Sequence, residues 1–294
     1  MNPPIVLVEL QIKGIRKLAK DKRLALGFVG ETPLANDILT ILDNLNIILL
    51  EYPIKTEGNK PAFSAALMYS EDGGQEIVFI GLNTADYFDK QVFTLAHELY
   101  HYYTKTGSHL CRLEDGEINA IEAQANRFAA EFLLPESVLG NIVFDEFKTS
   151  SLDKIQIKTL LRFIARLHCT WWLPYRAIVK RLKEIGAISD RQFTELYAIN
   201  ERDENGEYGR IGKAIDKDVF IKLNSATNNI GASPKNIEII IRNFEDNIID
   251  EDKLADTLLL FNKKPSDFGY EINVSQEDID EFNDFLSGED DDED

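Results

Sequence analysis

Cysteine is scarce in this chain of 294 residues, which contains two. Cys111 and Cys169 form no Cys-x-x-Cys pair, and two such residues do not build a disulfide-stapled domain. Long apolar runs are missing as well, because no stretch approaches the roughly 18 uninterrupted apolar residues that cross a bilayer. The short run Ile5–Val8 has no basic segment before it and is not expected to be a signal peptide. These absences predict a cytoplasmic protein that does not enter a membrane.

Basic residues are also few, since 32 Lys and Arg stand against 51 Asp and Glu and give a net charge of −19. Such a charge argues against non-specific binding of nucleic acid or of anionic membranes. The charge is uneven: residues 276–294 hold 11 acidic and no basic side chains, whereas residues 150–198 hold nine basic and four acidic ones. The acidity therefore belongs mainly to the C-terminal segment.

The segment 276–294 lacks the apolar surface to fold alone, so we predict a disordered acidic tail. An alternative stays open, because four of its apolar residues have the spacing of an amphipathic helix, which would make it a docking segment. These residues are Ile279, Phe282, Phe285 and Leu286.

The rest of the chain has an ordinary globular composition, with 44% hydrophobic residues overall. Strand-like and helical patterns mix in the first half, and helical patterns dominate beyond it. The fold class is therefore predicted as α+β, with a small three-stranded sheet followed by helical regions. Strands are expected at 46–52, 63–69 and 76–82, long helices at 87–103 and 117–134, and a linker at 200–212.

The segment Thr94–Tyr103 contains the motif His97-Glu98-x-x-His101. Two histidines four residues apart on a helix leave the same face, so both imidazoles can bind one zinc ion. Glu98 would lie beside the metal, where it can act as general base and then general acid. A chance match is expected in roughly one chain of this length in a hundred, and this chain has only four histidines. We therefore predict a zinc site with Glu98 as its catalytic residue.

A catalytic zinc site needs a third protein ligand and an open fourth position. The helix expected at 117–134 has an apolar stripe of 3.6-residue period, and Glu122 falls on it. Because a carboxylate on a buried face needs a positive partner, Glu122 is predicted as the third ligand, whereas Glu131 lies about 180° around the helix. Asn126, one turn after Glu122, is predicted to hydrogen-bond the free nitrogen of a ligating histidine. The alternative for Asn126 is an exposed helical amide.

The remaining histidines, His109 and His168, have no partners at metal-binding spacing and are predicted to be structural or solvated. Three tyrosines near the motif, Tyr100, Tyr102 and Tyr103, are predicted to be packing surface. One of them could stabilise an oxyanion, and the sequence does not single it out.

These motifs resemble the ImmA/IrrE family of zinc metallopeptidases. The resemblance rests on the segment Phe93–His101, on the segment Glu122–Pro135 and on a preceding strand that ends at Asn83. It covers residues 5–195. Two positions depart from the family pattern, and neither is a ligand.

The first departure is Tyr100, where the family usually has glycine and where a large side chain could narrow the cleft. The second is Leu134, where methionine is usual. The resemblance implies a zincin-like catalytic domain with three zinc ligands and Glu98 as general base and acid. The implied ligands are His97, His101 and Glu122.

The resemblance further implies an endopeptidase that cleaves a helix-turn-helix transcriptional repressor of a mobile element or a stress regulon. The expected regions are a catalytic domain at 1–145, a helix-turn-helix-like subdomain at 146–200, a helical partner or sensor region at 201–275 and the tail at 276–294. An alternative function is a non-catalytic, zinc-containing transcriptional regulator or partner-binding module.

The helix-turn-helix-like subdomain raises the question of direct DNA binding. Its second helix carries four basic residues that could meet phosphates. A solvated basic face, or one that docks on an acidic partner, is the favoured interpretation because the rest of the protein would repel DNA. The basic residues are Arg176, Lys180, Arg181 and Lys183.

Overall fold

The computed structural model describes residues 7–55, 63–72, 75–106 and 115–270 of the chain. It divides into two compact units, 1–230 and 231–294. Helices and a small mixed sheet make up the described residues, which confirms the predicted α+β class. Within the described ranges, no helix combines the length and apolarity needed to cross a membrane. The predicted acidic tail lies outside the described residues.

The sheet of the first unit contains the three predicted strands, β1 (Ile47–Tyr52), β2 (Ala65–Asp72) and β3 (Gln75–Asn83). β3 lies in the middle, antiparallel to β2 and parallel to β1. Alternate residues of β3 are buried, as the two-residue period of a half-covered strand requires; they are Val78, Ile80 and Leu82. One strand was not predicted, the two-residue β4 (Gly231–Ala232) that begins the second unit.

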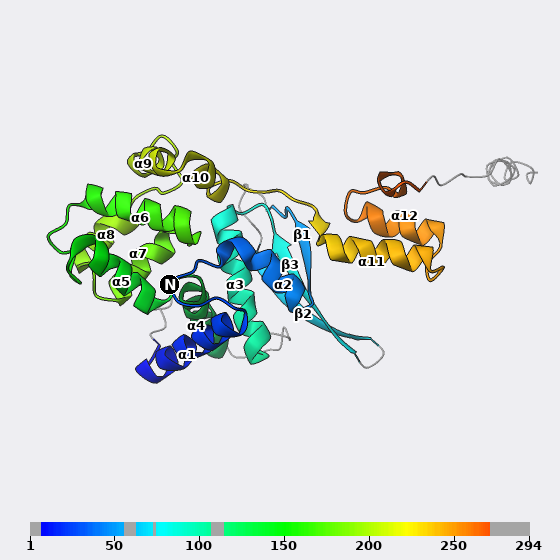
Figure 1. The fold of residues 1–294 in the computed structure, drawn as a ribbon, viewed down its shortest axis with the longest axis horizontal. Helices are drawn as coiled ribbons and strands as arrows, with labels where there is room; N and C mark the ends of the chain where they lie inside the picture. The colour runs from blue at the N-terminus through cyan, green and yellow to red at the C-terminus, as the bar shows by residue number, and fades with distance from the viewer. Residues whose placement is uncertain (1–6, 56–62, 73–74, 107–114, 271–294) are drawn as a thin grey trace, which may run out of the picture. The chain divides into compact units, whose positions relative to one another are not determined.

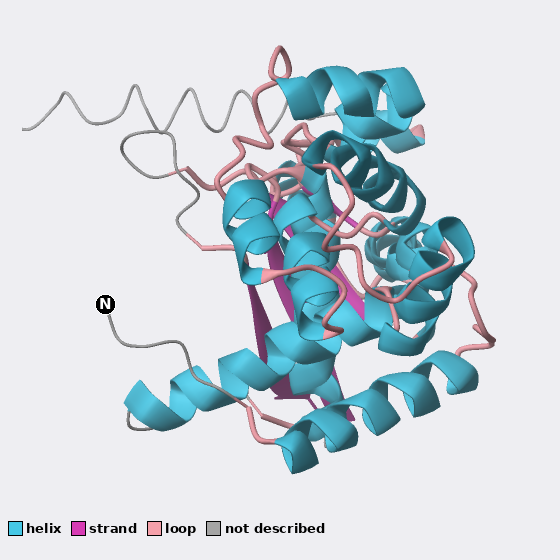
Figure 2. Cartoon of the chain, turned by 90° about the vertical axis from the view of Figure 1, so that its left-hand side faces the viewer, coloured by secondary structure: helices cyan, strands magenta, loops and turns pink. Residues whose placement is uncertain are grey.

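Four helices carry or support the predicted site (Figure 1). They are α1 (Glu9–Ala25), α2 (Ile38–Asn44), which follows the short 3₁₀ helix η1 (Ala35–Asp37), α3 (Phe88–Thr104) and α4 (Asp115–Leu133). α3 packs against β2, β3 and α4, and α1 packs along α4; in Figure 2 the strands lie behind a layer of helices. The facing sides of α3 and α4 are apolar and almost fully buried, with Leu95, Ala96, Leu99, Ala125, Phe128, Ala129 and Phe132 at the contact. This packing fixes the two helices that carry the motif residues.

Four further helices follow α4 in the first unit: α5 (Glu136–Phe147), α6 (Ile157–Trp171), α7 (Tyr175–Glu184) and α8 (Asp190–Tyr197). Buried ion pairs join them to the motif helices. Arg181 of α7 is 1% exposed and donates to Glu131 of α4 at 2.6 Å, while Arg127 of α4 pairs with Glu184 of α7. The charges of Arg127 and Arg181 are therefore neutralised inside the fold, as buried charges require.

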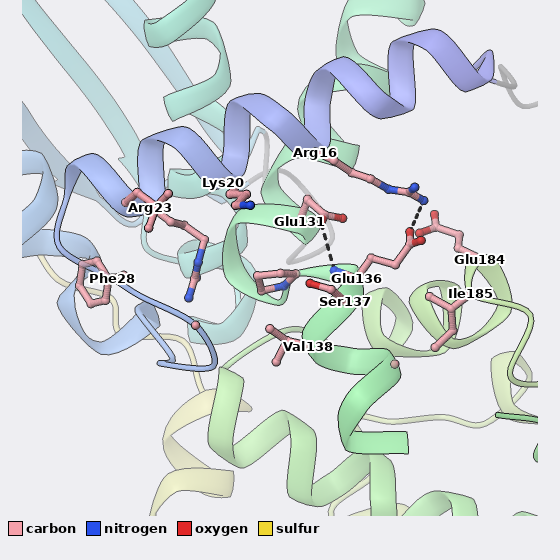
Figure 3. Close-up of a pocket in the computed structure, with 14 residues that line it drawn as sticks. Arg16, Lys20, Arg23, Phe28, Glu131, Glu136, Ser137, Val138, Glu184 and Ile185 are labelled. Carbon is pink, nitrogen blue, oxygen red and sulfur yellow. Dashed lines mark hydrogen bonds and ion pairs between the residues drawn. The ribbon is translucent and has the colours of Figure 1, made fainter. Parts of the chain in front are cut away.

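A cavity of about 600 Å³ lies beside these ion pairs, between α1 and the start of α5 (Figure 3). Arg16 of α1 reaches across it to Glu136, and the backbone N–H of Glu136 donates to Glu131 at 3.0 Å. None of the predicted metal ligands lines this cavity.

The prediction of a linker at 200–212 is wrong in its second half, because α9 (Glu207–Ile215) begins there and leads into α10 (Lys217–Leu223). Its glycines permit close packing and do not mark a flexible chain. A Cβ on Gly212 would lie 2.0 Å from the ring of Phe220, and one on Gly209 would lie 2.4 Å from the backbone oxygen of Asp203. Gly212 thus lets α9 pack closely against α10, and Gly209 lets α9 pack against the turn that precedes it.

The second unit contains α11 (Pro234–Glu245), α12 (Glu251–Leu259) and the 3₁₀ helix η2 (Pro265–Phe268). Its small apolar core is formed by Ile237, Leu254, Leu258 and Phe261. The carboxylate of Asp250 accepts a hydrogen bond from the backbone N–H of Lys253 and caps the start of α12. The helices predicted beyond residue 212 are thus present.

Candidate functional site

The motif residues lie on the last two turns of α3. His101 and Glu98 are buried, and the side chain of His97 is 13% exposed. The helix ends at Thr104, and the next residue, Lys105, takes a left-handed backbone conformation with φ of 53°. This turn folds the chain back, so that Thr106 comes next to His101.

The structure brings His97, His101 and Glu122 together. The two Nε2 atoms are 3.2 Å apart, and Glu122 Oε2 lies 3.0 Å from Nε2 of His97. Glu122 Oε1 lies 3.5 Å from Nε2 of His101. We call these three residues the metal-ligand cluster, since all three donor atoms lie within 4.8 Å of one another.

One expectation about Glu122 is wrong, because its side chain is 46% exposed and was expected on a buried face. The apolar stripe of α4 is buried at Ala125 and Phe128, but Glu122 lies at its margin, beside the open end of the cluster. Glu131 is 5% exposed and pairs with Arg181, away from the histidines.

The proton positions in the cluster follow from hydrogen-bond accounting. Asn126 presents its carbonyl Oδ1 to Nδ1 of His97 at 3.2 Å. A carbonyl oxygen accepts and does not donate, so Nδ1 must carry the hydrogen of the neutral imidazole. The lone pair of His97 Nε2 then points into the cluster.

The same accounting applies to His101 through a chain of two threonines, which the sequence did not single out. Thr104 donates its single hydroxyl hydrogen to the carbonyl of Tyr100 at 2.7 Å. The 2.6 Å bond between the hydroxyls of Thr104 and Thr106 must then be donated by Thr106. The Thr106 oxygen is left to accept from Nδ1 of His101 at 3.3 Å. His101 Nε2 therefore also points a lone pair into the cluster.

Two lone pairs 3.2 Å apart repel each other unless a cation lies between them and the carboxylate. Zinc ligands lie about 2.0–2.1 Å from the metal in tetrahedral geometry, which places neighbouring ligand atoms roughly 3.3 Å apart. The distances of 3.0, 3.2 and 3.5 Å match this spacing. The donor set and its hydrogen bonds fit a divalent metal ion.

The charges of the cluster agree with this interpretation. Contact with the imidazoles of His101 and His97 lowers the pKa of Glu122 well below its usual value, so Glu122 is a carboxylate. Burial lowers the pKa of His97, but Glu122 and Glu98 outweigh burial and raise the pKa above its ordinary value. A proton and a metal ion therefore compete for the lone pair on Nε2 of His97.

Glu98 lies next to the cluster and is 7% exposed. Burial raises the pKa of Glu98 above its ordinary value, although the positive charge of the two histidines opposes this rise. Glu98 is not one of the three converging donors. Glu98 is therefore not among the candidate metal ligands of the described residues.

The cluster opens into a hollow of about 390 Å³. Ser64 and Ala65 at the start of β2 form one edge, and Phe93 and Thr94 of α3 form another. Asn83 holds the β2 edge in place, because its buried side chain donates to the carbonyls of Ile54 and Phe63. The remaining lining residues are Asp86, Lys90, His97, Glu98, Glu122 and Asn126.

Tyr100, Tyr102 and Tyr103 do not line this hollow. Tyr100 is 7% exposed, packs against Phe128 and donates to Gln124 at 3.0 Å, so it lies between α3 and α4. It therefore does not narrow the cleft.

His168 lies in a different cluster with Asp89, Arg202 and Tyr208, in which Arg202 is 13% exposed and the other three residues are fully buried. Nε2 of His168 is 3.1 Å from Asp89, and its Nδ1 is 3.0 Å from the hydroxyl of Tyr208. Nη2 of Arg202 donates to both oxygens of Asp89 at 2.9 and 3.0 Å. We call these four residues the buried cluster. His109, which was predicted to be structural or solvated, lies outside the described residues, as does Cys111.

Comparison with known proteins identifies the part of the chain that carries this geometry. No curated protein matches the sequence. Residues 63–182 match the family model of the IrrE N-terminal-like domain, Peptidase_M78. The match contains β2, β3, the metal-ligand cluster, α5, α6 and most of α7. The chain thus contains an IrrE N-terminal-like domain of the metallopeptidase type, which confirms the resemblance to the ImmA/IrrE family.

Proposed function

We propose that the protein is a zinc-dependent endopeptidase in which His97, His101 and Glu122 hold the metal and Glu98 transfers protons. The observation that carries the proposal is the convergence of two imidazole lone pairs and one carboxylate beside an open hollow. Two histidines and a glutamate are the ligand set of many catalytic zinc sites. A bound zinc ion supplies Lewis-acid chemistry, since it polarises a peptide carbonyl and makes water more acidic.

Glu98 would perform the remaining chemistry. As a carboxylate it takes a proton from the water that attacks the peptide carbonyl, and it then gives this proton to the leaving amine. The C–N bond breaks, and a carboxylic acid and an amine are released.

A structural zinc site is disfavoured by the ligand count. Structural sites are closed by four protein ligands, whereas catalytic sites keep one position open. In the ranges covered by the structure, the metal-ligand cluster has three candidate donors. Its half-exposed Glu122 borders the hollow that a substrate would enter.

The substrate that we propose is a cytoplasmic regulatory protein, a helix-turn-helix repressor of a mobile element or stress regulon. This part rests on the resemblance to the ImmA/IrrE family. Cleavage of such a repressor would release transcription. A non-catalytic regulator that keeps the metal but does not cut its partner is the alternative.

Co-expression with the repressor-like protein encoded nearest to this chain tests the proposal. We expect the wild type to cut the repressor and Glu98→Gln to cut it about 10²- to 10⁴-fold more slowly. Glu195→Gln, which changes an exposed carboxylate on α8, is the matched control and should leave cleavage unchanged.

Metal analysis of the same proteins separates the alternatives. We expect Glu98→Gln to retain one zinc ion per chain, and His97→Ala and Glu122→Ala to lose it. Equal cleavage by wild type and Glu98→Gln would refute the proton-transfer role. A zinc-loaded wild type that binds the repressor without cutting it would favour the non-catalytic alternative.

A further inference from the structure

A second hollow of about 720 Å³ adjoins the one at the metal-ligand cluster. The two share Lys90 and Phe93 of α3 and Asn126 of α4 as lining residues. A peptide held over Glu98 can therefore extend into this second hollow, which we call the α7 groove. Its other walls come from the start of α1, from α4 and from α7.

The walls of the α7 groove are mostly apolar, and several are small side chains that leave room for a larger one. They are Leu7, Ile12, Phe93, Ala123, Ala130, Pro174 and Ala177. Arg127, Arg181 and Glu184 also line the groove. The charges of the two arginines are balanced by ion pairs with Glu184 and with Glu131 and Glu136 behind the groove. The groove thus has the shape and polarity to take one large apolar side chain.

The rim of the groove is basic in a chain that is acidic overall. Lys90, Arg176 and Lys180 line it and are exposed. Lys90 pairs with Asp86 at 3.3 Å, and Arg176 pairs with Glu201 at 2.9 Å. Within the described part of the chain, Lys180 has no carboxylate within ion-pair distance. Its amino group lies 5.9 Å from the centre of the Tyr197 ring.

These pairings also decide which class of partner the basic residues of α7 suit. Arg181 is buried, and Lys183 pairs with Asp190 at 2.8 Å. Among the four basic residues of α7, Lys180 alone lacks an acidic partner in the described structure. DNA binding uses several cations against successive phosphates, whereas one free cation beside an apolar groove matches one carboxylate beside an apolar side chain.

We propose that the α7 groove selects the substrate of the peptidase by a large apolar residue with an acidic residue close to it, and that Lys180 binds this acidic residue. The inference rests on the proposed function, because it assigns the groove to the peptide that Glu98 acts on. It gives the helix-turn-helix-like segment a role in protein recognition.

Peptide binding to the zinc-loaded Glu98→Gln protein tests the inference without cleavage. Three dye-labelled decapeptides are compared by fluorescence anisotropy: a central leucine flanked by aspartates, the same leucine flanked by asparagines, and a central serine flanked by aspartates. We expect the first to bind most tightly. Lys180→Glu should weaken it about fivefold or more, the effect of reversing one exposed charge, and leave the asparagine peptide unchanged.

Two further variants make the result specific to the groove. Ala177→Trp fills the groove and should weaken both leucine peptides but not the serine peptide. Arg162→Glu makes the same charge change on the exposed face of α6, outside the groove, and should change no affinity. Equal affinities for the three peptides, or equal effects of Lys180→Glu and Arg162→Glu, would overturn the inference.

Two other occupants are tested in the same assay. A variant that ends at residue 275 lacks the apolar and acidic residues of the segment 276–294. If this variant binds all three peptides equally, and more tightly than the full chain does, the segment 276–294 is the occupant of the groove. If a labelled DNA duplex binds and Lys180→Glu abolishes its binding, the groove serves nucleic acid. Either result would overturn the inference.

Failure of the inference and failure of the proposed function give different results. Cleavage of the co-expressed repressor that depends on Glu98 but not on Lys180 would overturn the inference and leave the function standing. Selective peptide binding without any cleavage of the repressor would overturn the proposed function and leave the recognition role of the groove standing.

Discussion

Helix α3 contributes to two clusters of histidine and carboxylate, and the two differ in how their charge is balanced. Near its end, the metal-ligand cluster points two lone pairs and a carboxylate at one another beside an open hollow. In its first turn, Asp89 belongs to the buried cluster, where Arg202 supplies the positive charge and Tyr208 completes the hydrogen bonds of His168. Asp89 and His168 are fully buried, whereas Glu122 is 46% exposed.

The comparison teaches how a histidine in a structural role differs from one in a metal site. A buried carboxylate needs a positive partner, and the buried cluster contains its own in Arg202. The metal-ligand cluster contains only ligand atoms, and a partner outside the cluster orients each of its two histidines. We expect changes in the buried cluster to affect stability, and changes in the metal-ligand cluster to affect metal binding.

The largest expected effect is that of Asp89→Ala on stability. It leaves the buried His168 and the largely buried Arg202 without their carboxylate, and removing one partner of a buried ion pair costs about 3–5 kcal/mol. The free energy of unfolding from chemical denaturation of the metal-free protein measures this loss. Asp89→Asn keeps the shape and tests the charge alone if the alanine variant does not fold.

Glu122→Ala is the matched change in the metal-ligand cluster. In metal-free protein we expect it to change the free energy of unfolding by less than about 1 kcal/mol, because the side chain is half exposed. Zinc should stabilise the Asp89→Asn variant but not Glu122→Ala. Similar losses of stability in the two metal-free proteins would contradict the assignment of stability to the buried cluster and of metal binding to the metal-ligand cluster.

Acidification should first weaken metal binding at the metal-ligand cluster and then, at lower pH, remove the stability that the buried cluster contributes. Burial lowers the pKa of His97, but Glu122 and Glu98 raise it above its ordinary value. Metal binds only the neutral imidazole, so affinity falls as the pH drops through this raised pKa. Burial raises the pKa of Asp89, but His168 and Arg202 outweigh it and hold the pKa below its ordinary value.

A lowered carboxyl pKa contributes stability that is complete above the ordinary pKa of aspartate and is lost as the pH falls through the lowered value. Each pKa unit corresponds to about 1.4 kcal/mol. Metal release should therefore precede the loss of this stability during an acid titration. Zinc content and circular dichroism, followed on the same samples, measure the two steps. Unfolding at or before metal release would contradict this order.

The sequence predicted the parts of the site that follow from helix geometry. The four-residue spacing of His97 and His101 places both on one face of any helix. The apolar periodicity of α4 predicted that Glu122 lies on the side of that helix that faces them. The exposure of Glu122 was wrong, because a periodic pattern locates a face but not the margin where that face meets solvent.

Long-range partners had no local signal. Asp89 and Arg202 are 113 residues apart, and only the packing of α3 against the later helices brings them together. Thr106 reaches His101 because Lys105 adopts a left-handed conformation, which is uncommon for lysine and which no pattern in the sequence marks. The glycines of α9 were mistaken for a linker because close helix packing and flexible chain use the same residue.

The smallest expected effects come from the hydrogen-bond partners of the two histidines. Thr106→Val keeps the side-chain shape but removes the acceptor for Nδ1 of His101, so the imidazole loses the bond that directs its lone pair at the metal. Loss of such a bond weakens metal binding about 10- to 100-fold, which competition with a chromophoric chelator measures.

Tyr208→Phe makes the corresponding change at His168, where it should lower the free energy of unfolding by about 1 kcal/mol and leave zinc affinity unchanged. Thr106→Val should instead weaken zinc binding and leave the free energy of unfolding nearly unchanged. Thr106 is only partly buried and orients a ligand, whereas Tyr208 is fully buried and fills the core. If Tyr208→Phe weakened zinc binding as much as Thr106→Val does, the two ends of α3 would be coupled, and the buried cluster would have to be counted among the groups that position the metal ligands.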